Sequence, residues 1–142
     1  MVNNSVNVSA YQGETPTSTG EQRVYLPGPI YPVEDVLRIL SQGDEQTRLW
    51  TRACIRDVGN MAFELAEVRE LVRLAIIDGA YVNSQWCIQK PSGPWAACDS
   101  YRLSRHEWVD SANKMMSLEY YVKYAISKTG KILLLVSCHM SQ

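Results

Sequence analysis

The sequence predicts an α+β fold, in which N-terminal helices pack on a mostly antiparallel sheet. Apolar residues recur at helical spacing in the first half of the chain, over residues 33–40 and 62–78. Segments rich in aromatic and β-branched residues follow, over residues 80–103 and 119–137. Because the helices come first and the strands after, this order favours α+β over an alternating β-α-β arrangement.

Composition limits the classes of function. The chain has 142 residues, a length typical of one domain with its own core, and its formal net charge is -1. General polyanion-binding proteins are more basic, so any contact with nucleic acid must depend on a local patch. The sequence has no apolar run near the roughly 20 residues of a membrane helix and no secretory signal pattern, so we expect a cytoplasmic protein without membrane contact.

The chain divides into an expected flexible leader, residues 1–24, and an expected single domain, residues 25–142. The leader is rich in Asn, Ser, Thr, Gly and Gln and holds little to bury. A proline-rich approach over residues 25–32 leads to the first helix. Glu34 and Asp35 lie in its first turn, where the helix dipole favours acidic side chains.

Residues 47–61 leave two interpretations open, because they can begin with a short extended segment or with a helix. They carry Arg48, Arg52 and Arg56 at a spacing of four, which makes one helical face if the whole segment is helical. Residues 62–78 give the clearest helix, with a broad apolar stripe opposite a face of Glu and Arg.

The second half of the chain predicts strands. One strand begins at Ala80, and a Pro-Ser-Gly-Pro loop at residues 91–94 separates it from a second over residues 95–103. We expect residues 104–116 to form a polar connection with a short helical turn. Residues 119–137 predict a hairpin whose second strand is apolar on both faces and therefore central in the sheet.

Familiar cofactor and catalytic motifs are absent from the sequence. It has no phosphate-binding loop, dinucleotide-binding glycines, His-Glu-x-x-His or Gly-x-Ser-x-Gly. With two histidines and no Cys-x-x-Cys spacing, we expect no metal and no cofactor, and four reduced thiols in or near the core. A cysteine-dependent enzyme using Cys138 or Cys98 is an alternative, although Cys138 and His139, as neighbours on a strand, point to opposite faces.

Basic and aromatic side chains are concentrated in the C-terminal half. Rings stack on unpaired bases, and Arg and Lys neutralise phosphates, so this mixture suits single-stranded RNA. The same rings also serve as ordinary core and rim residues. The set comprises Trp86, Trp95, Tyr101, Arg102, Arg105, His106, Trp108, Tyr120, Tyr121, Lys123, Tyr124 and His139.

His139, at the tip of the last strand, is the main catalytic candidate. Metal-free RNA cleavage needs a base for the 2′-OH, an acid for the leaving 5′-oxygen and a cation for the phosphorane. Histidine serves as acid or base because its pKa lies near neutrality. Tyr121 and Lys123 share one face of their strand, as Ser137 and His139 share one face of theirs. If the sheet joins these strands, the side chains and Arg102 converge.

Five segments, taken in order, resemble the MqsR family of toxins, the mRNA interferases of bacterial toxin–antitoxin pairs. They are VEDVLRILSQG (33–43), FELAEVRELVRLAIIDGAYVNS (63–84), CDSYR (98–102), YYVKYAI (120–126) and LLLVSCH (133–139). The resemblance covers about residues 32–141. It implies a RelE-like fold and a metal-independent endoribonuclease that cleaves single-stranded mRNA, inhibits translation and growth, and binds a cognate antitoxin.

The resemblance also assigns site residues. The catalytic Tyr of the family falls on Tyr121 and its C-terminal Lys on His139. Its other Lys falls on Asn83 and its Gln on Cys98, so the chain departs from the pattern there. The expected catalytic residues are His139 and Tyr121, and the expected RNA-binding residues are Arg102, Lys123, Asn83, Arg105 and Lys90, with Lys90 a candidate for the charge that Asn83 lacks.

A second hypothesis explains the same sequence without catalysis. The near-neutral charge and the asparagine at position 83 favour a non-catalytic interaction protein on a RelE-like scaffold that binds a protein partner. The two hypotheses differ in whether loss of His139 has an effect.

Overall fold

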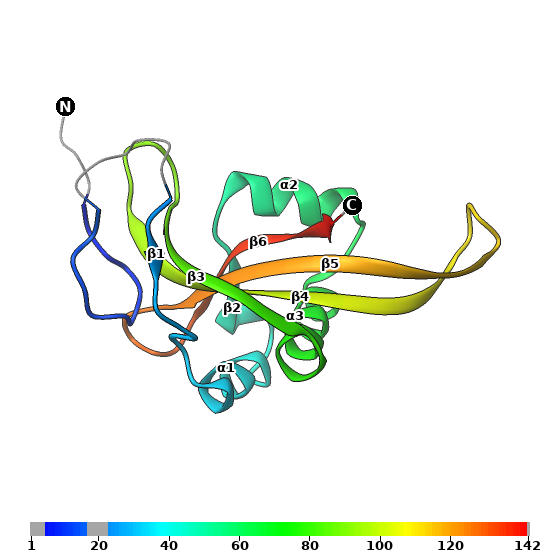
Figure 1. Cartoon of the computed structure of the whole chain (residues 1–142), viewed down its shortest axis with the longest axis horizontal. Coiled ribbons are helices and arrows are strands. Elements are labelled where there is room, and N and C mark those ends of the chain that lie inside the picture. Colours follow the sequence, from blue (N-terminus) through cyan, green and yellow to red (C-terminus); the bar gives the residue numbers. More distant parts are fainter. Residues whose placement is uncertain (1–4, 17–22, 142) are drawn as a thin grey trace.

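The fold of this chain combines one sheet with one layer of helices. The structure, a computed structural model, describes residues 5–16 and 23–141. Within these residues, three α-helices pack on a six-stranded, mostly antiparallel sheet, which confirms the α+β prediction (Figure 1). The elements are β1 (Tyr25–Leu26), α1 (Val33–Leu40), a 3-10 turn (Asp44–Gln46), β2 (Thr47–Leu49), α2 (Arg52–Asn60), α3 (Leu65–Asp78), β3 (Ala80–Ile88), β4 (Trp95–Val109), β5 (Lys114–Ile126) and β6 (Leu133–Ser141).

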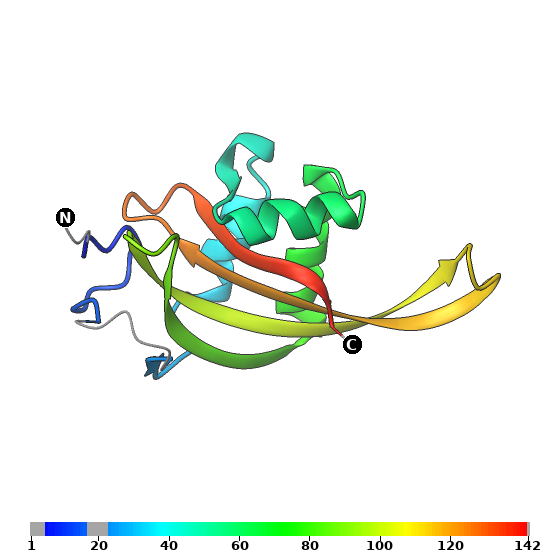
Figure 2. The same ribbon diagram turned by 90° about the horizontal axis from the view of Figure 1, so that it is seen from above.

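The strands follow the order β1-β3-β4-β5-β6-β2, and the β2–β6 pair is parallel. The helices lie on one face of this sheet (Figure 2), and the core fills the space between them. The side chain of Gln89, just after β3, donates from Nε2 to the carbonyl oxygen of Trp50, just after β2, at 2.8 Å. Four strand spacings separate β3 from β2, about 19 Å in a flat sheet. The sheet therefore curls, and this bond joins its two sides.

Residues 47–61 contain both of the structures left open by the sequence. Thr47–Leu49 form β2, and α2 begins at Arg52, where the Thr51 side chain caps the helix by accepting from the Cys54 amide at 3.1 Å. Arg48 thus lies on a strand, whereas Arg52 and Arg56 lie on a helix, so the arginine row is not one helical face.

The helix predicted for residues 62–78 is confirmed, with a later start. Ala62 has a positive φ of 57°, which ends the preceding turn. Glu64 then forms a capping box with Glu67, whose Oε1 accepts from the Glu64 amide at 2.9 Å. The helix therefore begins at Leu65 and buries its apolar stripe against the sheet.

The polar connection expected for residues 104–116 is wrong. These residues continue β4 and β5 as a two-stranded arm that extends beyond the other strands (Figure 1). The expected turn is present at its tip, where Asn113 has a positive φ of 53°. For most of its length the arm packs against no helix, so even Trp108 is 55% exposed. Its sequence therefore shows little alternation of apolar and polar residues. Sequence pattern detects strands through burial, so an exposed hairpin gives a weak signal.

The N-terminal segment differs from the expected flexible leader in its described part, residues 5–16. The Val8 amide donates to the carbonyl of Trp95 at 2.9 Å, and the Ala10 amide to that of Ile126 at 2.8 Å. Ser9 is fully buried. These contacts are made by backbone groups and by the Ser9 hydroxyl, which accepts from the Ala97 amide. A prediction based on apolar residues does not detect contacts of this kind. The rest of the predicted leader up to residue 22, residues 1–4 and 17–22, lies outside the described residues.

Candidate functional site

The sheet face opposite the helices carries the predicted catalytic residues in one row. Strand register pairs Arg102 of β4 with Tyr121 of β5, and Tyr121 with His139 of β6. The residues that precede them on these strands, Tyr101, Tyr120 and Cys138, are at most 5% exposed and belong to the core. Because side chains alternate along a strand, the row faces away from the helices.

Tyr121 and His139 lie in direct ring contact. Their centroids are 5.4 Å apart and the ring planes are inclined by 31°. The ammonium of Lys123 lies 5.7 Å from the Tyr121 ring centroid, within the range of a cation–π contact. A phenol, an imidazole and an ammonium thus share one half-exposed surface, because the register of β5 and β6 joins the strands as the sequence analysis required for convergence.

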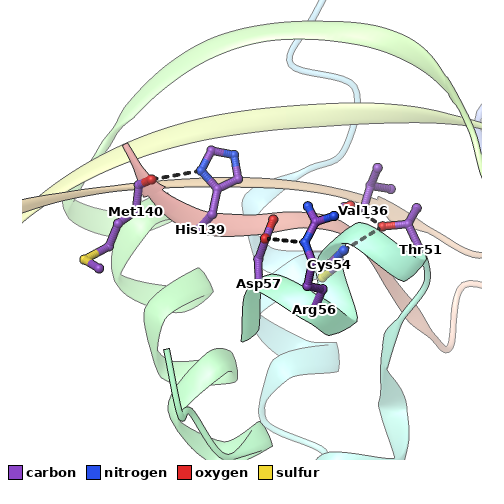
Figure 3. A network of polar contacts seen from close by, with 7 residues as sticks. All are labelled: Thr51, Cys54, Arg56, Asp57, Val136, His139 and Met140. Atoms are coloured by element: carbon purple, nitrogen blue, oxygen red, sulfur yellow. Dashed lines mark hydrogen bonds and ion pairs between the residues drawn. The ribbon is translucent and has the colours of Figure 1, made fainter. Parts of the chain in front are cut away.

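His139 lies on β6, and a hydrogen bond attaches this strand to the start of α2 (Figure 3). Thr51, the N-cap of α2, donates from Oγ1 to the carbonyl of Val136 at 2.8 Å. The His139 ring projects on the side of β6 away from α2, and its Nδ1 lies 3.1 Å from the carbonyl oxygen of Met140. A carbonyl only accepts, so this bond requires a proton on Nδ1 and leaves Nε2 of the neutral ring as a proton acceptor.

Arg102 occupies the β4 end of the row and is exposed. Its Nε lies 3.4 Å from Oε1 of Glu119, which shares the face of Tyr121 on β5. Exposed ion pairs of this kind are worth about 0–1 kcal/mol, so the pair holds Arg102 only weakly. Glu119 belongs to this surface but was missed in the sequence, although its spacing of two from Tyr121 places it there.

Asn83 lies on the same sheet face, in the next row. Its Oδ1 accepts a hydrogen bond from Ser100 Oγ at 2.8 Å, and Ser100 is opposite Lys123. Two strand spacings, about 10 Å, therefore separate Asn83 from Lys123. Ser100, which is buried and lies between them in the register, was also missed, because a lone serine in an apolar strand carries no distinctive pattern.

Two of the predicted RNA-binding residues lie apart from this surface. Arg105 is on the helix side of β4, where its guanidinium lies 5.0 Å from the Tyr120 ring centroid and its Nε 2.8 Å from Glu107 Oε2. Lys90 is in the β3–β4 loop, beyond the end of β3 that is far from Asn83. It does not reach the position where the resemblance expects a lysine. The sequence could not show that Arg105 and Lys90 lie away from the row, because strand register decides the position of the first and the path of the loop decides that of the second.

The structure opposes a cysteine nucleophile at Cys138 or Cys98. Burial raises the pKa of Cys138 to about 12. Burial also raises the pKa of Cys98, with a further contribution from its hydrogen bond to Cys87. A nucleophilic cysteine needs a thiolate near neutral pH, and both environments favour the thiol.

Two grooves of the described structure lie away from this row. One groove, between α1 and α3, includes Leu37, Arg69 and Ile77, and another, beside the N-terminal segment, includes Tyr11 and Ile30. Neither contains a residue of the row. In the described part of the chain, no group of three or more His, Cys, Asp or Glu side chains could hold a metal ion, and no helix there is long and apolar enough to cross a membrane.

Family models, curated proteins and solved structures all gave no match. The geometry of the sheet face is therefore the basis for the functional proposal.

Proposed function

We propose that the protein is the toxin of a type II toxin–antitoxin system, a RelE-like endoribonuclease that cleaves single-stranded mRNA in the cytoplasm without a metal and so inhibits translation and growth. The observation that supports it is the contact between the Tyr121 and His139 rings beside Lys123, on a sheet face that the helices leave uncovered. The resemblance of five sequence segments to the MqsR toxins supports the same proposal.

His139 acts as the general base in this proposal. Its Nε2 takes the proton of the ribose 2′-OH, and the oxygen attacks the adjacent phosphorus. The Tyr121 hydroxyl donates a hydrogen bond or a proton to the leaving 5′-oxygen. Lys123 and Arg102 hold the phosphate and balance the charge of the phosphorane. The products are a 2′,3′-cyclic phosphate and a free 5′-hydroxyl, because the attacking group comes from the RNA itself.

The cognate antitoxin in this proposal is a protein that covers the same sheet face. A partner with acidic side chains suits it, since Lys123 and Arg102 both lie there. Antitoxin and RNA then compete for the face, and excess antitoxin suppresses cleavage. Co-purification of a partner with the wild-type chain, and its loss with Lys123→Glu, would support this arrangement.

The direct test is cleavage of single-stranded RNA by purified protein in EDTA. His139→Ala should lower the cleavage rate about 100-fold or more, the range typical of a lost general base. His106→Ala is the matched control, since His106 is an exposed histidine on the arm and should leave the rate unchanged. Absence of cleavage by the wild-type protein, with RNA binding intact, would contradict the enzyme proposal.

A second candidate is a non-catalytic interaction protein on the same scaffold. The ion pair between Arg102 and Glu119 favours it, because it neutralises one of the cations on the face. Asn83 in place of a lysine removes another. This candidate predicts that His139→Ala leaves growth inhibition and partner binding unchanged, whereas the nuclease proposal predicts relief of growth inhibition.

A further inference from the structure

The arm formed by β4 and β5 has a strand edge without a partner. β3 pairs with β4 only as far as the pair of Ala80 and Arg102, whereas β5 follows β4 to Val109. In the described part of the chain, no strand other than β5 pairs with residues 103–109 of β4. These residues form one edge of the arm, which projects beyond the rest of the sheet (Figure 2).

The hydrogen-bonding groups on this edge follow from the start of β4. The Gln89 amide donates to the Pro94 carbonyl on the β3 side, at 2.9 Å. The amide and carbonyl of Trp95 bond instead to the N-terminal segment on the other side. Backbone groups alternate in this way along a strand, and β4 pairs with β5 without irregularity. The residues of β4 that direct both N–H and C=O outward from the arm are therefore Ser104, His106 and Trp108.

This edge lacks the features that keep most exposed strand edges from pairing. Such edges usually carry lysine, proline or a bulge. Residues 103–109 read LSRHEWV, and their register with β5 is regular. Trp108 and Met115, which are opposite each other on the arm, are 55% and 51% exposed. A two-stranded hairpin has little stability of its own in water, so a further strand on this edge would stabilise the arm.

We propose that a second copy of this chain pairs antiparallel with this edge, about a two-fold axis at His106, and forms a symmetric homodimer. In this register the two His106 residues are opposite each other, and Ser104 of each copy is opposite Trp108 of the other. Each of these pairs exchanges two N–H···O=C bonds, because their backbone groups point outward. The strand of the second copy ends with its Val109 opposite Leu103, the first residue beyond the pairing with β3.

Charge selects both the partner and the register. Arg105 and Glu107 lie on the helix side of β4, with Nε and Oε2 2.8 Å apart. In the pairing centred on His106, Arg105 of each copy is opposite Glu107 of the other, in the kind of cross-strand pair whose side chains lie closest. A pairing centred on Arg105 or on Glu107 would place like charges opposite each other, which is unfavourable. The edge is thus complementary to itself.

The two-fold axis of this dimer is perpendicular to the sheet. The sheet faces that the helices leave uncovered then look to the same side in both copies, and the helices to the other side. One pair of strand edges buries less than the roughly 1,200–2,000 Å² of stable complexes, so we expect a reversible dimer. Nuclease activity is not required for this dimer, and its readout is the mass of the assembly.

Sedimentation velocity of the full chain tests the dimer over concentrations from about 5 to about 500 μM, the range of micromolar association. We expect a shift from the 16.1 kDa monomer to twice that mass as the concentration rises. Dithiothreitol in the buffer excludes a disulfide between copies. A monomer over the whole range would overturn the proposal.

Proline on either edge of the arm tests which edge pairs. His106→Pro removes an N–H that points to the second copy and leaves the ladder to β5 intact. It should raise the dissociation constant about 10-fold or more, because the two central hydrogen bonds are lost. Ser117→Pro is the matched control, since Ser117 is opposite His106 and its N–H points to the other edge. It should leave the dissociation constant unchanged, and equal effects of the two variants would contradict the proposal.

Exchange of charge tests the register. Arg105→Glu and Glu107→Arg each place like charges opposite each other in a homodimer, so each should raise the dissociation constant about 10-fold or more. In a mixture of the two variants, both glutamates of one chain are opposite both arginines of the other, and association should return. Recovery in the mixture also shows that both variants are folded. A mixture that associates no better than its components would overturn the proposal.

Discussion

Two adjacent tyrosines on β5 show how differently the two faces of one sheet behave. Tyr120 faces the helices, is 2% exposed, and donates to Glu107 Oε2 at 2.6 Å. Burial raises its pKa, and the bond to Glu107 adds to this effect. Tyr121 faces away, is half-buried, and contacts His139. The same residue type thus supports the core on one face and is available for chemistry on the other.

The helix-covered face obtains its order from a buried polar group as well as from apolar packing. Asp99 is fully buried, and its carboxylate accepts from the amides of Ile30 and Tyr31 and from Ser84 Oγ. These bonds connect the segment before α1 to the middle of β4. Stability should therefore be sensitive to changes on this face, and activity to changes on the other.

The largest expected effect is the loss of stability in Asp99→Ala. It removes the carboxylate that accepts from the part-buried Ile30 amide, the buried Tyr31 amide and the buried Ser84 hydroxyl, which should lower the free energy of unfolding by on the order of 3 kcal/mol. Urea unfolding monitored by tryptophan fluorescence measures this, with the exposed Ser104→Ala as control. A change below about 1 kcal/mol would show that water or another group replaces the carboxylate.

Alkaline pH tests the helix-covered face next. Unfolded thiols ionise near pH 8.5, whereas burial keeps folded Cys54 and Cys138 protonated up to about 12. Between these values the folded state binds more protons, so stability falls as the pH rises. We expect a loss of on the order of 2 kcal/mol between about pH 8 and pH 10. The fall of stability with pH should be less steep in Cys138→Ala. An unchanged pH dependence would show that Cys138 does not contribute to it.

The two tyrosines give the sharpest comparison. Tyr120→Phe loses a hydrogen bond to a charged acceptor and should cost about 1–2 kcal/mol of stability. Tyr121→Phe should change stability by less than about 0.5 kcal/mol yet lower RNA cleavage by about 10-fold or more. Unfolding and cleavage are measured on both variants. Equal losses of cleavage in the two would remove the distinction between the faces.

The smallest expected effect concerns the ion pair on the open face. Glu119→Gln frees Arg102 and should change stability by less than about 0.5 kcal/mol. Affinity for single-stranded RNA should rise about 2–5-fold, with a steeper dependence on salt because one more cation meets phosphate. Filter binding at two salt concentrations measures it. Weaker binding in Glu119→Gln would mean that Glu119 orients Arg102 rather than competing for it.

The candidate site shows what strand periodicity can and cannot predict. Alternation along each strand is enough to place Tyr121 on one face with Lys123, and Ser137 on one face with His139. Their contact across the strands required the register of β5 and β6, which includes an irregularity between Lys123 and Tyr124. One extra residue in a strand moves the following side chains to the other face, so register cannot be obtained from the pattern alone.

The sequence by itself determined α1, α3 and the central strands, because residues at periods of 3.6 and 2 must bury their apolar faces wherever the chain folds. The tertiary structure alone decided which polar residues meet. It placed Arg105 on the helix side, left Lys90 in a distant loop, and brought the Tyr121 ring to His139. The physical reason is that buried faces leave a periodic pattern of apolar residues in the local sequence. Contacts between half-exposed side chains depend instead on strand register, sheet curvature and the path of the loops.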